Sequence, residues 1–171
     1  IREALKEALD AGLTHYVSDA GIPELREAIA KWYNENFNVD YTMRNALVTH
    51  GSTNGLTYVI ANLILPGDEI AIITPNWFGY WSKMDYYRAK VVEIPLSPPG
   101  WKFDPEALEE RITPRTRLLL LSSPNNPTGS ILSRKDLEAI GELAEKHDFY
   151  VVADEIYCEL VYDGEEFTSI G

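Results

Sequence analysis

The sequence predicts an α/β fold in three layers, a mostly parallel sheet with helices on both of its faces. Two observations predict this fold. Short, almost wholly apolar segments recur along the chain, and longer segments with apolar residues at helical spacing separate them. This alternation runs without an internal repeat or a low-complexity stretch, and no linker divides the chain by composition.

Two helices are predicted ahead of the first strand. Residues 1–11 carry apolar side chains at helical spacing, and Gly12 stands where a helix commonly ends. After a segment of loop composition, Pro23 occupies the first turn of a second predicted helix, which runs to Phe37. Residues 46–49 are then predicted to form a short strand.

Helices and strands alternate over the rest of the chain. The further strands are predicted over residues 69–73, 90–94, 117–122 and 149–153, with 159–162 as a candidate for one more. The further helices are predicted over residues 56–65 and 77–88, from Asp104 onward, and from Ser133 to His147. Asp104 and Ser133 are residue types that favour the N-cap position of a helix.

The composition argues against several classes of function. The chain has 171 residues, of which 45% are apolar and 25% charged, as in an ordinary globular protein. Its 15 Lys and Arg against 27 Asp and Glu give a net charge of −12, which argues against nucleic-acid binding and against docking on an anionic membrane. A small anionic ligand remains compatible with this charge, because backbone amides bind such ligands locally. The single cysteine, Cys158, excludes a disulfide within the chain and favours a reducing, cytoplasmic location.

Candidate binding residues follow the predicted strands. In an open α/β sheet, ligands bind beyond the carboxyl ends of the strands. Gly51-Ser52-Thr53 leads into a predicted helix, whose positive end and backbone amides suit a phosphate, although a plain N-cap with a glycine turn is the more common occurrence of such a segment. Trp77 follows the strand at 69–73 and can either stack on a planar ligand or pack in the core.

More candidates follow the later strands. Asn126, in a loop bounded by prolines, can donate its amide to a ligand oxygen or simply form a turn. Asp154 can face a cationic group of a ligand, cap a helix or lie in solvent. Tyr157 can donate its phenol hydroxyl to a ligand or simply pack at the rim of the site. His50 and His147 fit capping or surface positions better than catalysis, and no His, Cys or Asp spacing resembles a metal site.

Five segments carry a more specific pattern when they are taken together. The most specific are SSPNNPTG at 122–129 and the segment 151–171, which contains Asp-Glu-x-Tyr. The others are YVSDAGIPELREAIAKWY at 16–33, LVTHGSTNGL at 47–56 and ITPNWFGY at 73–80. In this order they resemble the fold-type I, pyridoxal-phosphate-dependent aminotransferases of class I/II, over essentially the whole chain. Five segments in the family's order are far more specific than any one of them.

The resemblance implies pyridoxal 5'-phosphate as the cofactor and gives roles to the residues around its ring. Asp154 would pair with the pyridine nitrogen and keep it protonated, which makes the ring a better acceptor of carbanion electrons. Asn126 and Tyr157 would hydrogen-bond the 3-oxygen of the ring. Trp77 would stack on the face of the ring.

The resemblance also implies how the phosphate is held. Gly51, Ser52 and Thr53 would bind it at the start of the helix. Tyr16 would reach the phosphate of the neighbouring subunit, because family members build their sites at the interface of a homodimer. A departure from some aspartate-type members, which have His where this chain has Tyr80, leaves the subgroup open.

As an activity, the resemblance implies transfer of an amino group between an L-amino acid and a 2-oxo acid. The Schiff-base lysine of the family is expected beyond Gly171, so no catalytic residue is expected within residues 1–171. We interpret residues 1–171 as part of the large cofactor-binding domain, with the N-terminal arm, the lysine segment and the C-terminal small domain outside it.

The sequence is also compatible with other functions. A pyridoxal-phosphate-dependent carbon–sulfur β-lyase of the cystathionine β-lyase-like branch would share the scaffold and most cofactor contacts. A truncated cofactor-binding domain without catalytic activity would explain the missing lysine. An unrelated nucleotide-binding domain would leave PNNPTG and Asp-Glu-x-Tyr unexplained.

Overall fold

The computed structural model describes residues 1–171, which form two compact units, residues 1–50 and residues 51–171. The second unit holds the entire sheet. The interpretation of the chain as part of one large cofactor-binding domain stays a prediction. None of the helices combines the length and the apolar character that crossing a membrane requires.

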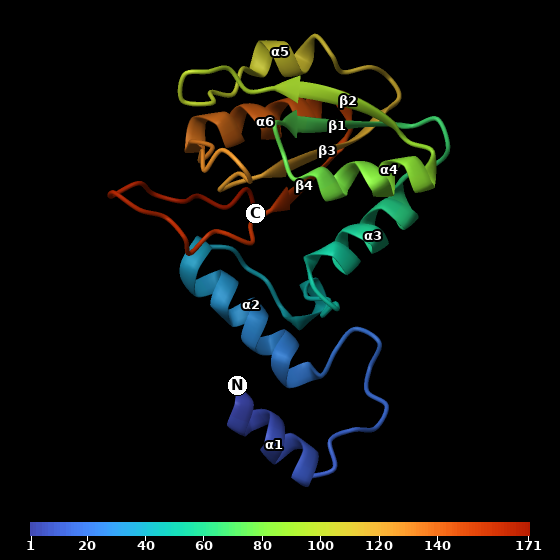
Figure 1. Cartoon of the computed structure of the whole chain (residues 1–171), viewed down its shortest axis with the longest axis vertical. Coiled ribbons are helices and arrows are strands. Elements are labelled where there is room, and N and C mark those ends of the chain that lie inside the picture. Colours follow the sequence, from blue (N-terminus) through green and yellow to red (C-terminus); the bar gives the residue numbers. More distant parts are fainter. The chain divides into compact units, whose positions relative to one another are not determined.

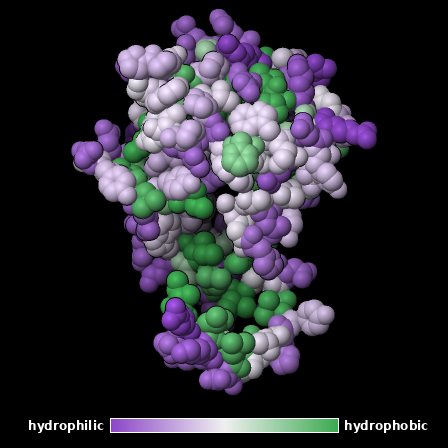
Figure 2. Space-filling view, in the orientation of Figure 1, coloured by the Kyte–Doolittle hydropathy of each residue, from purple (hydrophilic) through white to green (hydrophobic).

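The first unit contains two helices and a short 3₁₀ turn. The helices are α1 (Arg2–Asp10) and α2 (Pro23–Phe37), as predicted, and the 3₁₀ turn spans Met43–Asn45. Gly12, just past the end of α1, has a φ of 70°, a conformation that favours glycine. Figure 2 shows apolar side chains on the surface of this unit, where Leu5, Leu9 and Leu13 are more than half exposed.

The strand predicted at 46–49 does not form. Ala46 has extended backbone angles, but its carbonyl accepts from Nε of Arg26 at 2.8 Å. The backbone N–H of Val48 donates to the carbonyl of Ala20, a loop residue, at 3.0 Å. The segment 46–49 is therefore extended at Ala46, but the backbone groups of Ala46 and Val48 bond to a side chain and to a loop rather than to a neighbouring strand.

The second unit is built on a sheet of parallel strands (Figure 1). The strands are β1 (Glu69–Thr74), β2 (Lys90–Pro95), β3 (Thr116–Ser122) and β4 (Tyr150–Asp154). Their order in the sheet is β2-β1-β3-β4, and each neighbouring pair is parallel. The predicted strands at these positions are confirmed to within one residue at each end.

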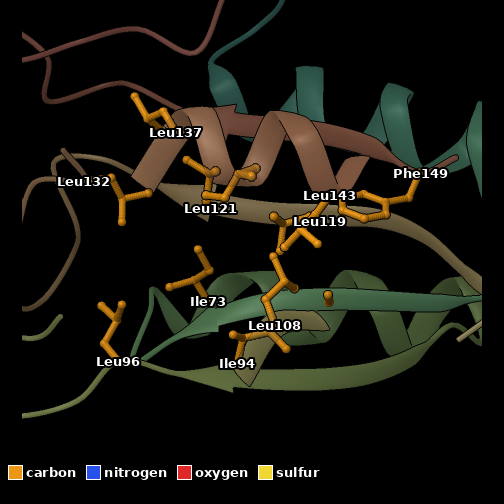
Figure 3. Close-up of a cluster of buried hydrophobic side chains, with 12 residues drawn as sticks. Ile73, Ile94, Leu96, Leu108, Leu119, Leu121, Leu132, Leu137, Leu143 and Phe149 are labelled. Atoms are coloured by element: carbon orange, nitrogen blue, oxygen red, sulfur yellow. The ribbon is translucent and has the colours of Figure 1, made fainter. Parts of the chain in front are cut away.

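Helices cover both faces of this sheet, which confirms the predicted three-layer α/β fold. The helices are α3 (Ser52–Leu63), α4 (Trp81–Tyr87), α5 (Pro105–Glu109) and α6 (Arg134–His147). On one face, Leu119 and Leu121 of β3 pack in a core with α5 and α6 (Figure 3). Leu118 and Leu120 point to the other face and pack in a core with α3 and α4. The two-residue period of the strand thus supplies both cores from one apolar run.

Three other predictions differ from the structure. The helix predicted at 56–65 begins earlier, at Ser52, and ends at Leu63. The helix predicted at 77–88 is divided into a 3₁₀ turn at Phe78–Tyr80 and the shorter α4, which ends where Arg88 adopts a φ of 56°. The candidate strand at 159–162 is irregular, because backbone bonds such as Leu160 N–H to Tyr157 carbonyl (2.8 Å) form turns there. The predicted N-caps hold, since the side chains of Asp104 and Ser133 accept backbone N–H groups at the starts of α5 and α6.

Candidate functional site

A pocket of about 170 Å³ lies in the second unit, at the carboxyl ends of β1, β3 and β4. The predicted residues that line it are Ser52, Thr53, Trp77, Asn126, Asp154 and Tyr157. Parallel strands end at one edge of the sheet, so the residues that follow them meet there although they are far apart in the sequence. The sequence thus predicted the place of the pocket and most of its lining.

The start of α3 forms one wall of the pocket. Gly51 is the N-cap of this helix, with a φ of 80° and no side chain to cap the first turn. A residue with a side chain would be strained at that φ. The hydroxyls of Ser52 and Thr53 stand in the first turn, where the helix dipole and the backbone amides favour an anion. This wall can bind a phosphate group.

Asp154, the last residue of β4, supplies the one charged side chain among the residues that line the pocket. Its Oδ2 accepts a hydrogen bond from the Tyr80 hydroxyl at 2.8 Å, and its Oδ1 accepts from the backbone N–H of Ile156 at 3.3 Å. Burial, and then the hydrogen bond to Asp154, raise the pKa of Tyr80 well above its ordinary value, so Tyr80 stays a neutral donor. Both carboxylate oxygens are thereby fixed, and the group can pair with a cationic N–H of a ligand.

Asn126 and Tyr157 meet on another side of the pocket. The Asn126 amide donates to the Tyr157 hydroxyl at 3.3 Å. The Tyr157 hydroxyl accepts this bond and therefore keeps its own proton to donate to a ligand oxygen. Neighbouring Asn125 holds the loop, because its Oδ1 accepts from the Thr128 hydroxyl (2.8 Å) and its amide donates to the Pro75 carbonyl (3.2 Å). The first bond lies within the loop after β3, and the second ties that loop to the segment after β1.

Trp77 offers the pocket an aromatic surface. Its ring meets the Tyr80 ring edge to face, with centroids 5.4 Å apart and an interplanar angle of 87°. Its backbone N–H donates to Oδ1 of Asn76 at 2.8 Å. An indole held in this way can stack on a planar ligand.

Three lining residues were not among the predicted site residues, namely Tyr80, Ser122 and Ile156. The sequence marks Tyr80 only as a departure from some aspartate-type members of the family that it resembles. Tyr80 stands three residues after Trp77, and this spacing is a usable signal, because a 3₁₀ turn brings residues three apart to the same side of the turn. Ser122 is the last residue of β3, and its position at the carboxyl end of a strand is a signal that could have identified it. Ile156 is 61% exposed and carries no chemical signal in the sequence.

Two predicted residues do not line this pocket. Gly51 precedes Ser52 and acts on the pocket through the start of α3, as the N-cap of that helix. Tyr16 belongs to the first unit, where its side chain is fully exposed. Its role toward a neighbouring subunit stays a prediction.

Comparison with known proteins shows which family this chain resembles and which relatives it has. The family model described as aminotransferase class I and II matches residues 1–170. The chain is 41% identical to the aspartate/prephenate aminotransferase of Thermus thermophilus, over 98% of this chain and 44% of that protein. It is 37% identical to the aromatic-amino-acid aminotransferase 2 of Thermococcus litoralis, over 99% of this chain and 44% of that protein.

Solved structures agree with the sequence comparison. The aspartate aminotransferase of Thermus thermophilus with maleate matches with a TM-score of 0.93 and 41% identity, over 98% of this chain and 44% of that one. The chain therefore spans about 44% of the length of the relatives described here.

Proposed function

This chain belongs to the class I and II aminotransferases, and from that membership we propose that the full-length protein containing it transfers an amino group between an L-amino acid and a 2-oxo acid. We propose pyridoxal 5'-phosphate as its cofactor. The observation that carries the proposal is the pocket, in which an anion-binding helix start, an aromatic face, a fixed carboxylate and an amide–phenol pair converge. The chain spans about 44% of the relatives' length, so the activity is proposed for the full-length protein.

The residues of the pocket fit this cofactor group by group. The cofactor has a phosphate, a ring nitrogen that can carry a proton, and a ring oxygen that can carry negative charge. Ser52 and Thr53 suit the phosphate, and Asp154 suits the protonated ring nitrogen. Asn126 and Tyr157 suit the ring oxygen, and Trp77 suits the face of the ring.

When bound, the cofactor would accept the electrons that are released when the Cα–H bond of the substrate breaks. Residues of this chain would prepare the cofactor for that chemistry. Asp154 would keep the ring nitrogen protonated, because a carboxylate next to an N–H favours the charged form. Tyr80 would hold Asp154 in place through its 2.8 Å hydrogen bond. Asn126 and Tyr157 would stabilise negative charge on the ring oxygen by donating to it.

The charge of the pocket also indicates that other parts of the protein must supply cationic groups. No Lys or Arg is among the residues that line it. A phosphate and a substrate carboxylate both need cationic partners, and the cofactor aldehyde needs an amine. We propose, as the resemblance implies, that these groups come from other parts of the protein, and that Tyr16 contributes to the partner's site in a homodimer.

Two assays of the full-length protein separate the candidate activities. Amino transfer predicts that L-aspartate or an aromatic L-amino acid is converted to its oxo acid only when a 2-oxo acid acceptor is present. A carbon–sulfur β-lyase predicts release of pyruvate and a thiol from a cysteine conjugate without an acceptor. The relatives described above are named aminotransferases, which supports amino transfer. Pyruvate release alone, with no acceptor-dependent turnover, would contradict the proposal.

A further inference from the structure

The indole of Trp77 lies directly over Gly79. A Cβ atom built on Gly79 would stand 2.3 Å from Cη2, 2.4 Å from Cζ2 and 2.6 Å from Cζ3 of Trp77. Real Cβ atoms do not approach other heavy atoms this closely. Every one of these atoms belongs to the six-membered ring of the indole, and none is at the end of a flexible chain. A side chain at residue 79 would therefore force the indole to move.

The 3₁₀ turn explains this close packing. The backbone N–H of Tyr80 donates to the carbonyl of Trp77 at 3.3 Å, so the chain folds back beneath the indole. The φ of Gly79 is not in the left-handed region, in contrast to that of Gly51. Glycine is thus needed at residue 79 for the space that it leaves and not for its backbone conformation.

Lys83 contacts the same ring. Its Nζ lies 5.4 Å from the centroid of the Trp77 ring and donates to the carbonyl of Gly79 at 3.2 Å. Trp77 lines the pocket, whereas Lys83 does not. The ammonium therefore meets the indole outside the pocket lining, while the Gly79 carbonyl holds the ammonium in place. A cation at this distance is attracted by the ring quadrupole.

We propose that Gly79 and Lys83 are positioning residues that set the orientation of the Trp77 indole in the pocket. Gly79 leaves room for the ring, and Lys83 holds the ring from outside the pocket lining. The inference rests on the proposed function in one respect, namely that Trp77 stacks on the ring of a bound cofactor. A stacked pair needs a defined plane, so a displaced indole loses the contact.

A double-mutant cycle in the full-length protein tests the role of Gly79. The dissociation constant of pyridoxal 5'-phosphate is measured for the wild type, Gly79→Ala, Trp77→Phe and the double variant. We expect Gly79→Ala to weaken binding about three- to tenfold, the size of a lost aromatic contact. In the Trp77→Phe background the same change should alter binding less than about twofold, because a phenyl ring lacks the atoms that clash. Equal losses in the two backgrounds would overturn the inference.

Near-ultraviolet circular dichroism of the cofactor-free protein gives a second readout. The Trp77 signal is obtained by subtracting the spectrum of Trp77→Phe, and Gly79→Ala should change it. Gly141→Ala is the matched control, since a Cβ at Gly141 in α6 meets nothing within 4 Å. That control should leave both the spectrum and the cofactor affinity unchanged. An unchanged Trp77 signal in Gly79→Ala would also overturn the inference.

Two substitutions test Lys83. Lys83→Met keeps an unbranched apolar stem but removes the cation, and we expect a loss of about two- to fivefold in cofactor affinity. Lys83→Arg keeps the cation and should bind the cofactor as the wild type does. Equal affinities of the Met and Arg variants would overturn the part assigned to Lys83. If the wild type itself bound no pyridoxal 5'-phosphate, the proposed function would fail, whereas the dichroism of the cofactor-free protein would still decide the packing of Trp77.

Discussion

The Tyr80 hydroxyl donates a 2.8 Å hydrogen bond to Oδ2 of Asp154, and so joins the turn after β1 to the end of β4. The two residues are 74 positions apart in the sequence. Tyr80 is 1% exposed, and its raised pKa keeps it a donor over the whole physiological range. The single charged group of the pocket lining is thus oriented by a neutral, buried phenol.

Tyr80→Phe tests this relationship, because it removes the hydroxyl and leaves the ring in place. A hydrogen bond to a charged group contributes about 1.5–3 kcal/mol, so we expect kcat/KM for the amino transfer proposed for the full-length protein to fall roughly 10- to 100-fold. Tyr80→His can keep a donor and should lose less. Tyr86→Phe, at an exposed tyrosine of α4, is the control and should leave the rate unchanged. Identical rates for Tyr80→Phe and the wild type would show that the bond does not matter for catalysis.

Ser52→Ala tests the phosphate wall of the pocket. The variant should bind pyridoxal 5'-phosphate about tenfold more weakly, because a donor to a charged group is lost at the start of α3. It should bind pyridoxal, which lacks the phosphate, as the wild type does. Parallel titrations with the two compounds make the comparison. A loss of the same size for both compounds would place Ser52 away from the phosphate.

Glu69→Gln tests an ion-pair cluster at the start of β1. The side chain of Glu69 is fully buried and accepts from Lys90 (2.8 Å), Thr113 (2.6 Å) and Arg115 (3.3 Å). These partners, with the bond from Lys90 first, lower the pKa of Glu69 below its ordinary value of 4.5. We expect the substitution to reduce the free energy of unfolding at pH 7 by about 1–3 kcal/mol, measured by chemical denaturation.

The pH dependence of this effect has a definite sign. Because the pKa is lower in the folded state, the stabilisation is fully present above the ordinary pKa and is lost as the pH falls through the folded-state pKa. The difference between wild type and Glu69→Gln should therefore shrink in acid. Glu93→Gln, at an exposed position of β2, should change stability by less than about 0.5 kcal/mol. A difference that grew in acid would contradict the assignment.

Ser133→Ala tests the cap of α6. The Ser133 hydroxyl accepts from the backbone N–H of Asp136 at 3.2 Å, and Asp136 Oδ2 accepts from the backbone N–H of Ser133 at 2.9 Å. Loss of this capping box should cost about 1 kcal/mol of stability and leave cofactor affinity unchanged. Thermal denaturation and a cofactor titration on the same samples measure both. An unchanged midpoint would mean that the cap contributes nothing.

The fold was predictable where the signal is local. Runs such as Leu118–Leu121 are too apolar to be exposed and too short to be buried helices, so their identity as strands follows from composition and length. The segment 46–49 has a similar composition, yet a strand also needs a neighbour with free backbone groups. No window of sequence shows whether that neighbour exists.

The site was predictable where its residues lie at the carboxyl ends of parallel strands, because ligands bind at that edge of the sheet. Asp154 ends β4 and Asn126 lies in the loop after β3, so the topology alone brings them together. The bond between Tyr80 and Asp154 depends on the course of a 3₁₀ turn and on a distant strand, and the packing of Trp77 over Gly79 depends on side-chain orientation. Contacts of this kind are set by tertiary packing, which a residue pattern does not contain.

The most direct test of the account replaces Asp154 by Ala in the full-length protein and compares two cofactors. With pyridoxal 5'-phosphate, kcat/KM for amino transfer should fall about 100- to 1000-fold, because the ring nitrogen loses the carboxylate that keeps it charged. With the analogue methylated at the ring nitrogen, which is permanently charged, the Asp154→Ala variant should recover at least about tenfold. A variant as active as the wild type, or one that the methylated cofactor does not rescue, would contradict the role of Asp154 on which the proposed function depends.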